Sequence, residues 1–206
     1  MTRQRVVQGP PPSSVSGFPV TVHDDVVYRA ARFEPWWFCT CGDCRFDLHG
    51  TGTPRQGTLY AGTDPVTGVL EALGPDLAGR PVARTFLARR TVWMLAYDRP
   101  VDLADLCSDA AIGFGVTNEL SVMIPYTTPQ QWAEAFAAEG LDGISYRTRF
   151  STGPAATGIA LFDAAGAHDW PKTACCIANS AEIESELAGR HISVEDPPPA
   201  AALTLL

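Results

Sequence analysis

Three charged residues lie inside otherwise apolar stretches of the chain. Their side chains are of the types that bind phosphate and stabilise positive charge on a sugar. Arg29 and Arg45 each carry a planar guanidinium that can bind a phosphate through two parallel hydrogen bonds. Glu71 offers a carboxylate that can stabilise positive charge developing on a sugar, and Tyr60 offers a face for stacking a flat ring. Taken singly, each is more often a solvated side chain or part of a structural ion pair such as Arg29–Glu71. Only the combination favours a site.

A cluster of cysteines directly precedes Arg45. Cys39, Cys41 and Cys44 form a C-x-C-x-x-C pattern, which can in principle hold zinc. Tetrahedral zinc needs four ligands, and the spacing fixes neither His49 nor the Cys175–Cys176 pair as the fourth. We therefore expect all six cysteines of the chain to be thiols, and we expect no metal site.

These residues have to be positioned by strands and helices. Runs rich in β-branched and aromatic residues predict six strands. They are Val26–Arg32, Gly57–Gly62, Ala83–Arg89, Thr91–Tyr97, Gly143–Arg149 and Gly158–Phe162.

Start and stop signals predict three helices. Asp64 and Pro65 open the first, which presents Val69, Leu70 and Leu73. A capping box at 128–131 begins the second, which runs to Gly140 with Trp132, Ala135 and Phe136 on its apolar face. A second box at 179–182 begins a helix that Gly189 ends.

The strands and helices follow no strict βαβ rhythm, so the pattern predicts an α+β fold. No G-x-G-x-x-G follows a strand, which argues against a Rossmann cofactor site.

Length and composition fit one soluble domain. The chain has 206 residues, of which 46% are hydrophobic, and its net charge is −8. This acidity argues against nucleic acid as a partner, and no segment resembles a signal peptide or a membrane span, so we expect a cytoplasmic protein. The prolines and serines of 9–17 predict a flexible arm over 1–24, followed by a single catalytic domain over 25–195 and a tail over 196–206.

Several short motifs resemble the RES domain family, in order and in spacing, from about Val26 to Phe162. The motifs are Val27-Tyr28-Arg29, Pro35-Trp36-Trp37-Phe38, Arg45-Phe46, Gly57-Thr58-Leu59-Tyr60-Ala61, Leu70-Glu71, Gln131-Trp132-Ala133 and Gly143-Ile144-Ser145-Tyr146-Arg147-Thr148-Arg149. The resemblance implies that Arg45, Glu71 and Thr148 are catalytic. It also implies a substrate-binding set, namely Tyr28, Arg29, Phe46 and Tyr60. Thr148 stands where the family has serine, and its β-methyl stiffens the side chain.

The resemblance also implies a fold and an activity. The fold would be similar to that of ADP-ribosyltransferases, with a split mixed or antiparallel β-sheet flanked by helices. The activity would be cleavage of NAD⁺ at its nicotinamide–ribose bond, with water or inorganic phosphate as acceptor and with no cofactor. Transfer of ADP-ribose to a protein or small molecule, and non-catalytic binding of NAD⁺ or ADP-ribose, are the alternatives. Some family members are toxins paired with an Xre-type antitoxin, which would be the partner here, alongside a homodimer.

Overall fold

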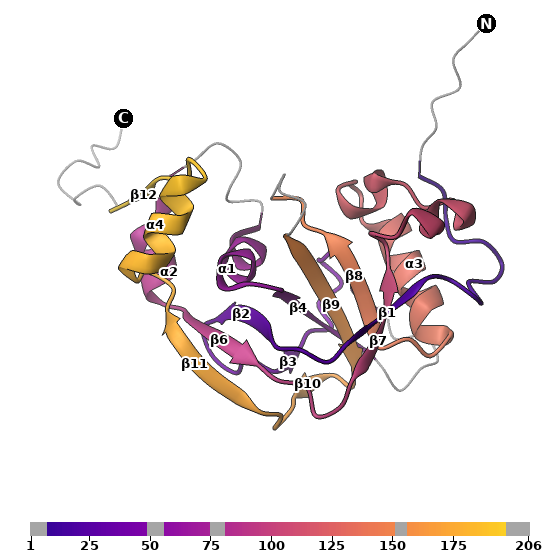
Figure 1. Cartoon of the computed structure of the whole chain (residues 1–206), viewed down its shortest axis with the longest axis horizontal. Helices are drawn as coiled ribbons and strands as arrows, with labels where there is room; N and C mark the ends of the chain where they lie inside the picture. Colours follow the sequence, from indigo (N-terminus) through magenta and orange to yellow (C-terminus); the bar gives the residue numbers. More distant parts are fainter. Residues whose placement is uncertain (1–7, 49–55, 75–80, 151–155, 197–206) are drawn as a thin grey trace, which may run out of the picture.

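An eight-stranded mixed sheet forms the centre of the computed structural model, which describes residues 8–48, 56–74, 81–150 and 156–196 (Figure 1). In spatial order its strands are β1 (Val20–His23), β7 (Val101–Asp105), β8 (Gly143–Arg147), β9 (Thr157–Asp163), β4 (Gly57–Gly62), β2 (Val27–Ala31), β6 (Thr91–Leu95) and β11 (Lys172–Ile177). Neighbours are antiparallel except for the parallel pair β7–β8. The register between β4 and β2 is a single pair, Tyr28 with Gly62, so the sheet splays into two halves there. The predicted α+β class with a split mixed sheet is confirmed.

Helices and short strand pairs cover this sheet. The helices are α1 (Pro65–Leu73), α2 (Arg84–Ala88), α3 (Thr127–Ala138) and α4 (Ala181–Gly189), with 3-10 helices η2 (Asp109–Phe114) and η3 (Asn118–Ser121). The short pairs are β3 (Trp37–Phe38) with β10 (Gly166–Ala167), and β5 (Val82–Ala83) with β12 (Val194–Glu195). In Figure 1, α1 lies over the middle of the sheet, α3 lies at the end near β1 and β7, and α4 lies near α2 at the other end.

Helix α1 is seated at the splay of the sheet. Its start follows the sequence signal, because the Asp64 carboxylate accepts the N–H of Thr67 at 2.9 Å and Pro65 occupies the first turn. A Cβ added at Gly68 would lie 2.4 Å from the carbonyl oxygen of Tyr28, and one at Gly62 would lie 2.6 Å from the backbone N of Gly68. The two glycines therefore let α1 approach β2 and β4 closely.

The predicted strand at Ala83–Arg89 is wrong. Only Val82 and Ala83 are extended, and Arg84–Ala88 form α2. The buried side chains are Val82 and Leu87, whose separation does not follow the two-residue period of a strand. Arg84 forms ion pairs with Glu184 and Asp196, so contacts distant in sequence decide this segment.

Two predicted helix caps also differ from the structure. Helix α3 begins at Thr127, and its cap residue, Tyr126, makes no side-chain capping bond. Its buried apolar face uses Trp132 and Phe136 as expected, whereas Ala135 is only partly buried. The cap of α4 is Ser180, whose hydroxyl accepts the N–H of Ile183, and the helix ends at Gly189 as predicted.

The expected flexible arm is wrong over residues 8–24, because they pack against the domain. Phe18 lies in the core with its ring 4.7 Å from that of Phe136, and Val15 is buried beside it. Gln8 is buried and accepts the N–H of Thr117 at 2.7 Å. Strand β1 completes the sheet by pairing with β7, so this segment belongs to the fold. The remainder of the arm, 1–7, and the tail beyond 196 lie outside the described residues.

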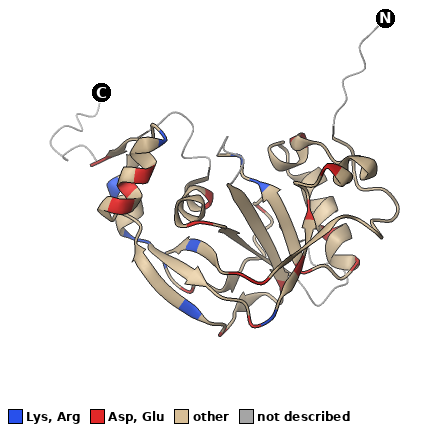
Figure 2. Cartoon of the chain, in the orientation of Figure 1, with Lys and Arg blue, Asp and Glu red and all other residues tan. Residues whose placement is uncertain are grey.

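Among the described helices, none has the length and apolar character required to cross a membrane. In the view of Figure 2, lysines and arginines are scattered over several elements, and α4 carries several acidic positions close to Arg84 of α2.

Candidate functional site

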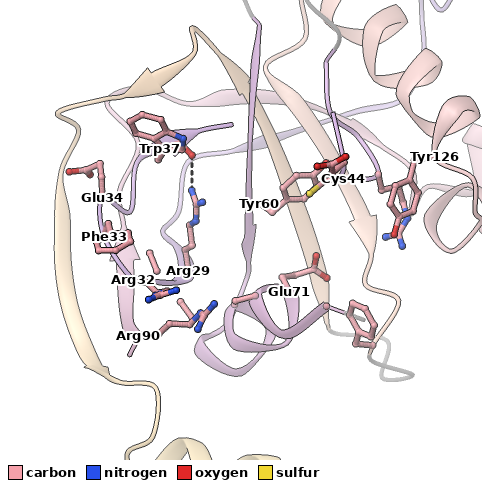
Figure 3. Close-up of a pocket in the computed structure, with 18 residues that line it drawn as sticks. Arg29, Arg32, Phe33, Glu34, Trp37, Cys44, Tyr60, Glu71, Arg90 and Tyr126 are labelled. Atoms are coloured by element: carbon pink, nitrogen blue, oxygen red, sulfur yellow. Dashed lines mark hydrogen bonds between the residues drawn. The ribbon is translucent and has the colours of Figure 1, made fainter. Parts of the chain in front are cut away.

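A cavity of about 730 Å³ opens beside α1. Its walls come from α1, from the chain between β2 and β3, from the cysteine loop before Arg45, and from Tyr60, Tyr126 and Phe150. Figure 3 shows Arg29, Arg32 and Arg90 on one side, and Glu71, Tyr60 and Tyr126 on the other. Ligand pockets for small molecules commonly have volumes of about 300–1,000 Å³, so the cavity has the size of a binding site.

Glu71 projects from α1 into this cavity. Its Oε2 accepts a hydrogen bond from the Tyr146 hydroxyl at 2.7 Å. Its Oε1 is buried and has no hydrogen-bond partner in the part of the chain that the structure describes. Burial raises the pKa of Glu71, while the Tyr146 hydrogen bond and the charge of Arg45 oppose that rise. One oxygen of the carboxylate is thus fixed by a hydrogen bond, and the other is buried without a described partner.

Arg45 lies on the cysteine-loop side of the cavity and is 8% exposed. Its guanidinium carbon lies 5.4 Å from the ring centroid of Tyr126, within reach of a cation–π contact. Its Nε is buried and has no hydrogen-bond acceptor among the described residues. Because its charge lowers the pKa of Glu71, the two residues that the sequence selected are electrostatic neighbours.

Arg29 lines the cavity but has a structural task as well. One of its terminal nitrogens, Nη1, donates to the carbonyl oxygens of Pro35 and Trp37, each at 3.0 Å. Figure 3 shows the bond to Trp37. Burial lowers the pKa of Arg29 to about 10, so the side chain stays charged at neutral pH. Its described contacts do not include an ion pair with Glu71, the alternative that the sequence left open.

Tyr60 lines the cavity, and two hydrogen bonds fix its hydroxyl. The hydroxyl accepts the N–H of Phe46 at 2.7 Å and donates to Oδ1 of Asp47 at 3.0 Å. Burial, followed by the nearby Asp47 charge, raises the pKa of Tyr60 well above its usual value. The ring is therefore a neutral, oriented surface.

Three other predicted site residues do not line the cavity. Tyr28 packs against the apolar cluster beneath α1. Phe46 is fully buried in the core, with its ring 5.0 Å from that of Tyr146. Thr148 is buried immediately after β8, and its hydroxyl has no partner within the described residues.

The sequence reasoning missed Tyr146, Tyr126, Arg32 and Arg90. Tyr146 lies within the RES-like motif Gly143–Arg149, but only Thr148 of that motif was predicted to belong to the site. Arg90 stacks over the ring of Phe86 at 3.4 Å, and Arg32 lies near Phe33 at the exposed end of β2. No local spacing relates these residues to Glu71, so only the fold brings Tyr126, Arg32 and Arg90 to the cavity and Tyr146 to Glu71.

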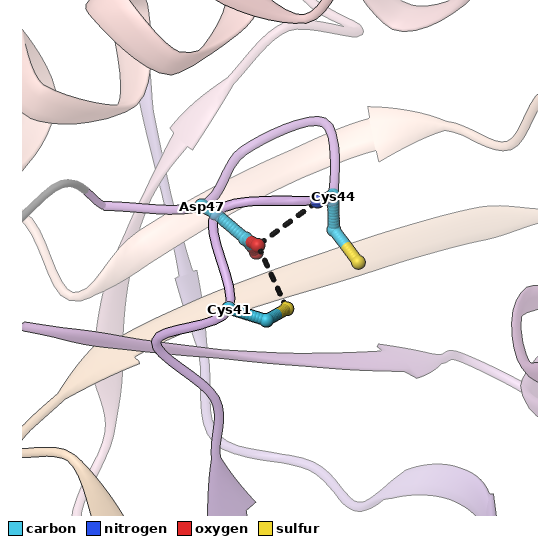
Figure 4. Close-up of side chains that lie close together, drawn as sticks. All are labelled: Cys41, Cys44 and Asp47. Atoms are coloured by element: carbon cyan, nitrogen blue, oxygen red, sulfur yellow. Dashed lines mark hydrogen bonds between the residues drawn. The ribbon is translucent and has the colours of Figure 1, made fainter.

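The cysteine loop brings together three groups that could bind a metal ion. The Sγ atoms of Cys41 and Cys44 and a carboxylate oxygen of Asp47 all lie within 4.8 Å of one another (Figure 4). The pair Cys175–Cys176 lies on β11 and takes no part in this group.

The fold and cavity together define an α+β protein with a buried glutamate and several arginines around one cavity. The chain matches the family model of the RES domain over residues 22–176, and it belongs to this family. It is also similar in fold to a chain of the crystal structure of the M. tuberculosis MbcT–MbcA toxin–antitoxin complex. That similarity has a TM-score of 0.50 and 12% sequence identity, and covers 81% of this chain and 92% of the other. The search of curated proteins gave no match.

Proposed function

We propose that this chain consumes NAD⁺ by breaking the bond between nicotinamide and ribose. The observation that carries the proposal is the state of Glu71, which is fixed through Oε2 by Tyr146 and has a buried, unpartnered Oε1 beside the cavity. A buried acceptor without a donor is costly, which favours a ligand that supplies the missing hydrogen bonds. The ribose hydroxyls on the nicotinamide side of NAD⁺ are such donors.

The chemistry follows from that position. As the bond to nicotinamide lengthens, positive charge spreads over the ribose ring, and an ionised Glu71 beside it stabilises that charge. Nicotinamide leaves as a neutral molecule and needs no general acid, so one carboxylate suffices. Water or inorganic phosphate then attacks the anomeric carbon. This scheme uses no cofactor.

Arginines at the other side of the cavity suit the pyrophosphate. Arg29, Arg32 and Arg90 lie on the wall away from Glu71 (Figure 3), and Arg45, which follows the cysteine loop, lies beside Tyr126. Guanidinium groups bind phosphate oxygens through paired, charge-assisted hydrogen bonds. NAD⁺ would therefore extend from the arginine wall to Glu71, with its nicotinamide ring against Tyr60.

Thr148 is proposed to assist at the same end. It follows Tyr146 by two residues, so the two side chains share a face if the extended backbone of β8 continues. Its hydroxyl is buried without a described partner and is suited to a ribose hydroxyl or to the incoming nucleophile. Contact with a ligand requires a small opening of the cavity, because Thr148 does not line it in this structure.

We propose further that the chain is the toxin of a toxin–antitoxin pair that acts in the cytoplasm. The support is the fold shared with a chain of a toxin–antitoxin complex. Loss of NAD⁺ would be the toxic event, and a cognate antitoxin of the Xre type would be the partner.

The experiment incubates the purified chain with NAD⁺, with and without inorganic phosphate, and identifies the products by mass spectrometry. Nicotinamide together with ADP-ribose indicates water as acceptor, and a phosphorylated ADP-ribose indicates phosphate. Glu71→Gln should lack the activity, whereas Glu139→Gln, at the exposed end of α3, is the matched control. Nicotinamide release only after a protein acceptor is added would replace the proposal with ADP-ribosyl transfer. No release under any condition would leave a binding module.

A further inference from the structure

The loop between β3 and β4 places three metal-binding side chains around one point. Cys41, Cys44 and Asp47 follow one another at intervals of three residues, and their ligand atoms lie within 4.8 Å of one another (Figure 4). Zinc–sulfur bonds measure about 2.3 Å and zinc–oxygen bonds about 2.0–2.2 Å, so ligands around one zinc ion are roughly 3.5–4 Å apart. Small side-chain adjustments would therefore bring all three to one cation.

Asp47 is the buried, acidic member of this group. Its side chain is fully buried. Its described hydrogen-bond donors are all neutral, namely the Tyr60 hydroxyl at 3.0 Å, the Cys44 N–H at 2.9 Å and the Cys41 thiol at 3.3 Å. No ion pair to Asp47 occurs within the ranges that the structure describes. Buried carboxylates are normally paired with a positive charge or bound to a metal.

We propose that Cys41, Cys44 and Asp47 bind a zinc ion. Cys39 lies in the same loop, and its Sγ accepts the N–H of Cys41 at 3.2 Å, but it is not among the three residues whose ligand atoms lie within 4.8 Å of one another. Binding replaces the thiol hydrogen bond to Asp47 with a shared cation and releases the thiol protons to solvent. The Tyr60 hydroxyl and the Cys44 N–H would remain as the hydrogen bonds that orient the ligating carboxylate, an arrangement typical of metal sites.

The alternative use of these cysteines is a redox pair, and their surroundings disfavour it. Reactive cysteines have a lowered pKa, because the thiolate is the nucleophile. Here the thiol of Cys41 donates a hydrogen bond to the buried carboxylate of Asp47 at 3.3 Å, and this contact favours the protonated thiol over the thiolate. A neighbouring carboxylate thus disfavours a thiolate on its own, whereas a divalent cation would offset the negative charge of all three groups.

A cation here would stiffen one wall of the cavity. Cys44 lines the cavity, and Asp47 holds the hydroxyl of Tyr60, which also lines it. Arg45 follows Cys44 directly in the chain. The site does not depend on the proposed NAD⁺ chemistry, and its test reads metal binding alone.

The test uses the full chain, purified without a polyhistidine tag and without added metal. Metal analysis should find about one equivalent of zinc, and exchange for Co²⁺ should give the near-ultraviolet absorption of thiolate–cobalt charge transfer. Cys41→Ser and Asp47→Asn should both lose the metal and the absorption. Cys175→Ser, an exposed cysteine on β11, and Asp43→Asn, an exposed carboxylate of the same loop, are the matched controls and should keep both.

Folding is controlled by the melting temperature. Asp47→Asn alters a buried contact to Tyr60, but Cys41 is exposed, so Cys41→Ser should fold and decide the test. A chelator should lower the melting temperature of the wild-type chain and leave that of Cys41→Ser unchanged. Three results would overturn the proposal: wild-type protein that neither contains zinc nor binds Co²⁺, a Cys41→Ser variant that keeps the absorption, or a Cys41–Cys44 disulfide in the purified protein.

Discussion

The hydroxyl of Tyr146 donates to Oε2 of Glu71 at 2.7 Å, and this contact joins strand β8 to helix α1. Tyr146 is fully buried, and a Cβ at Gly158 would come within 2.5 Å of its ring, so glycine at that position gives the ring its place. Because Tyr146 occupies one carboxylate oxygen, Glu71 has a fixed orientation, and its Oε1 is left without a hydrogen-bond partner among the described residues.

Tyr146→Phe should shift the pH dependence of activity. The hydrogen bond from Tyr146 lowers the pKa of Glu71 against the effect of burial, so its loss should raise that pKa further. Activity that needs ionised Glu71 is lost as pH falls through this pKa, so the acid limb of the kcat profile should move to higher pH. The expected direction is therefore a loss of activity at a higher pH than in the wild-type chain. A profile identical to wild type would show that the contact has only a structural role.

Glu71→Gln should lower kcat by about two to three decades, equivalent to about 3–4 kcal/mol of transition-state stabilisation. The amide keeps the size of the side chain and can still accept from Tyr146, so the melting temperature should change little. Single-turnover release of nicotinamide, measured beside thermal unfolding, checks both statements. Near-normal turnover in this variant would remove Glu71 from the mechanism.

Arg45→Ala should weaken NAD⁺ binding by about 10–100-fold, since a charge-assisted hydrogen bond contributes about 1.5–3 kcal/mol. Arg45→Lys should restore little, because lysine lacks the bidentate fork and the planar group that faces Tyr126. Calorimetric titration with NAD⁺ measures the affinity directly. Wild-type affinity in the alanine variant would refute the contact with phosphate.

Arg29→Ala should primarily lower stability. Its Nη1 donates to the carbonyl oxygens of Pro35 and Trp37, and losing the donor should cost about 1–3 kcal/mol in the free energy of unfolding. Urea denaturation of this variant beside Arg45→Ala separates the two arginines. An Arg29→Ala protein of unchanged stability but reduced NAD⁺ affinity would show that phosphate binding is its main task.

Gly68→Ala should destabilise the fold by about 1–3 kcal/mol, as expected when a methyl group is forced into a packed interface. Its new Cβ would lie 2.4 Å from the Tyr28 carbonyl oxygen and push α1, together with Glu71, away from β2. Gly113→Ala is the matched control, because a Cβ there has no neighbour within 4 Å. Equal stability of the two variants, measured by urea denaturation, would mean that α1 can shift without cost.

Elements with local signals were predictable from the sequence. The Asp64–Pro65 start of α1 and the β-branched or glycine-bounded runs of β2, β4 and β9 depend on interactions within a few residues. The RES motifs selected Arg45 and Glu71, which the structure places as electrostatic neighbours beside one cavity. The acidic net charge and the α+β class could likewise be predicted without knowledge of long-range contacts.

Tertiary contacts decided the rest. Arg84–Ala88 is helical because Leu87 is buried and Arg84 reaches Glu184, a hundred residues away along the chain. Residues 8–24 have the composition of a linker, yet the ring of Phe18 packs against that of Phe136. The cysteine pattern alone gives no sign of Asp47 as a possible ligand, because its complete burial beside Tyr60 and the cysteines is a property of the folded chain. The burial of Asp47 and the hydrogen bond between Tyr146 and Glu71 arise only when distant segments pack, so no local sequence pattern encodes them.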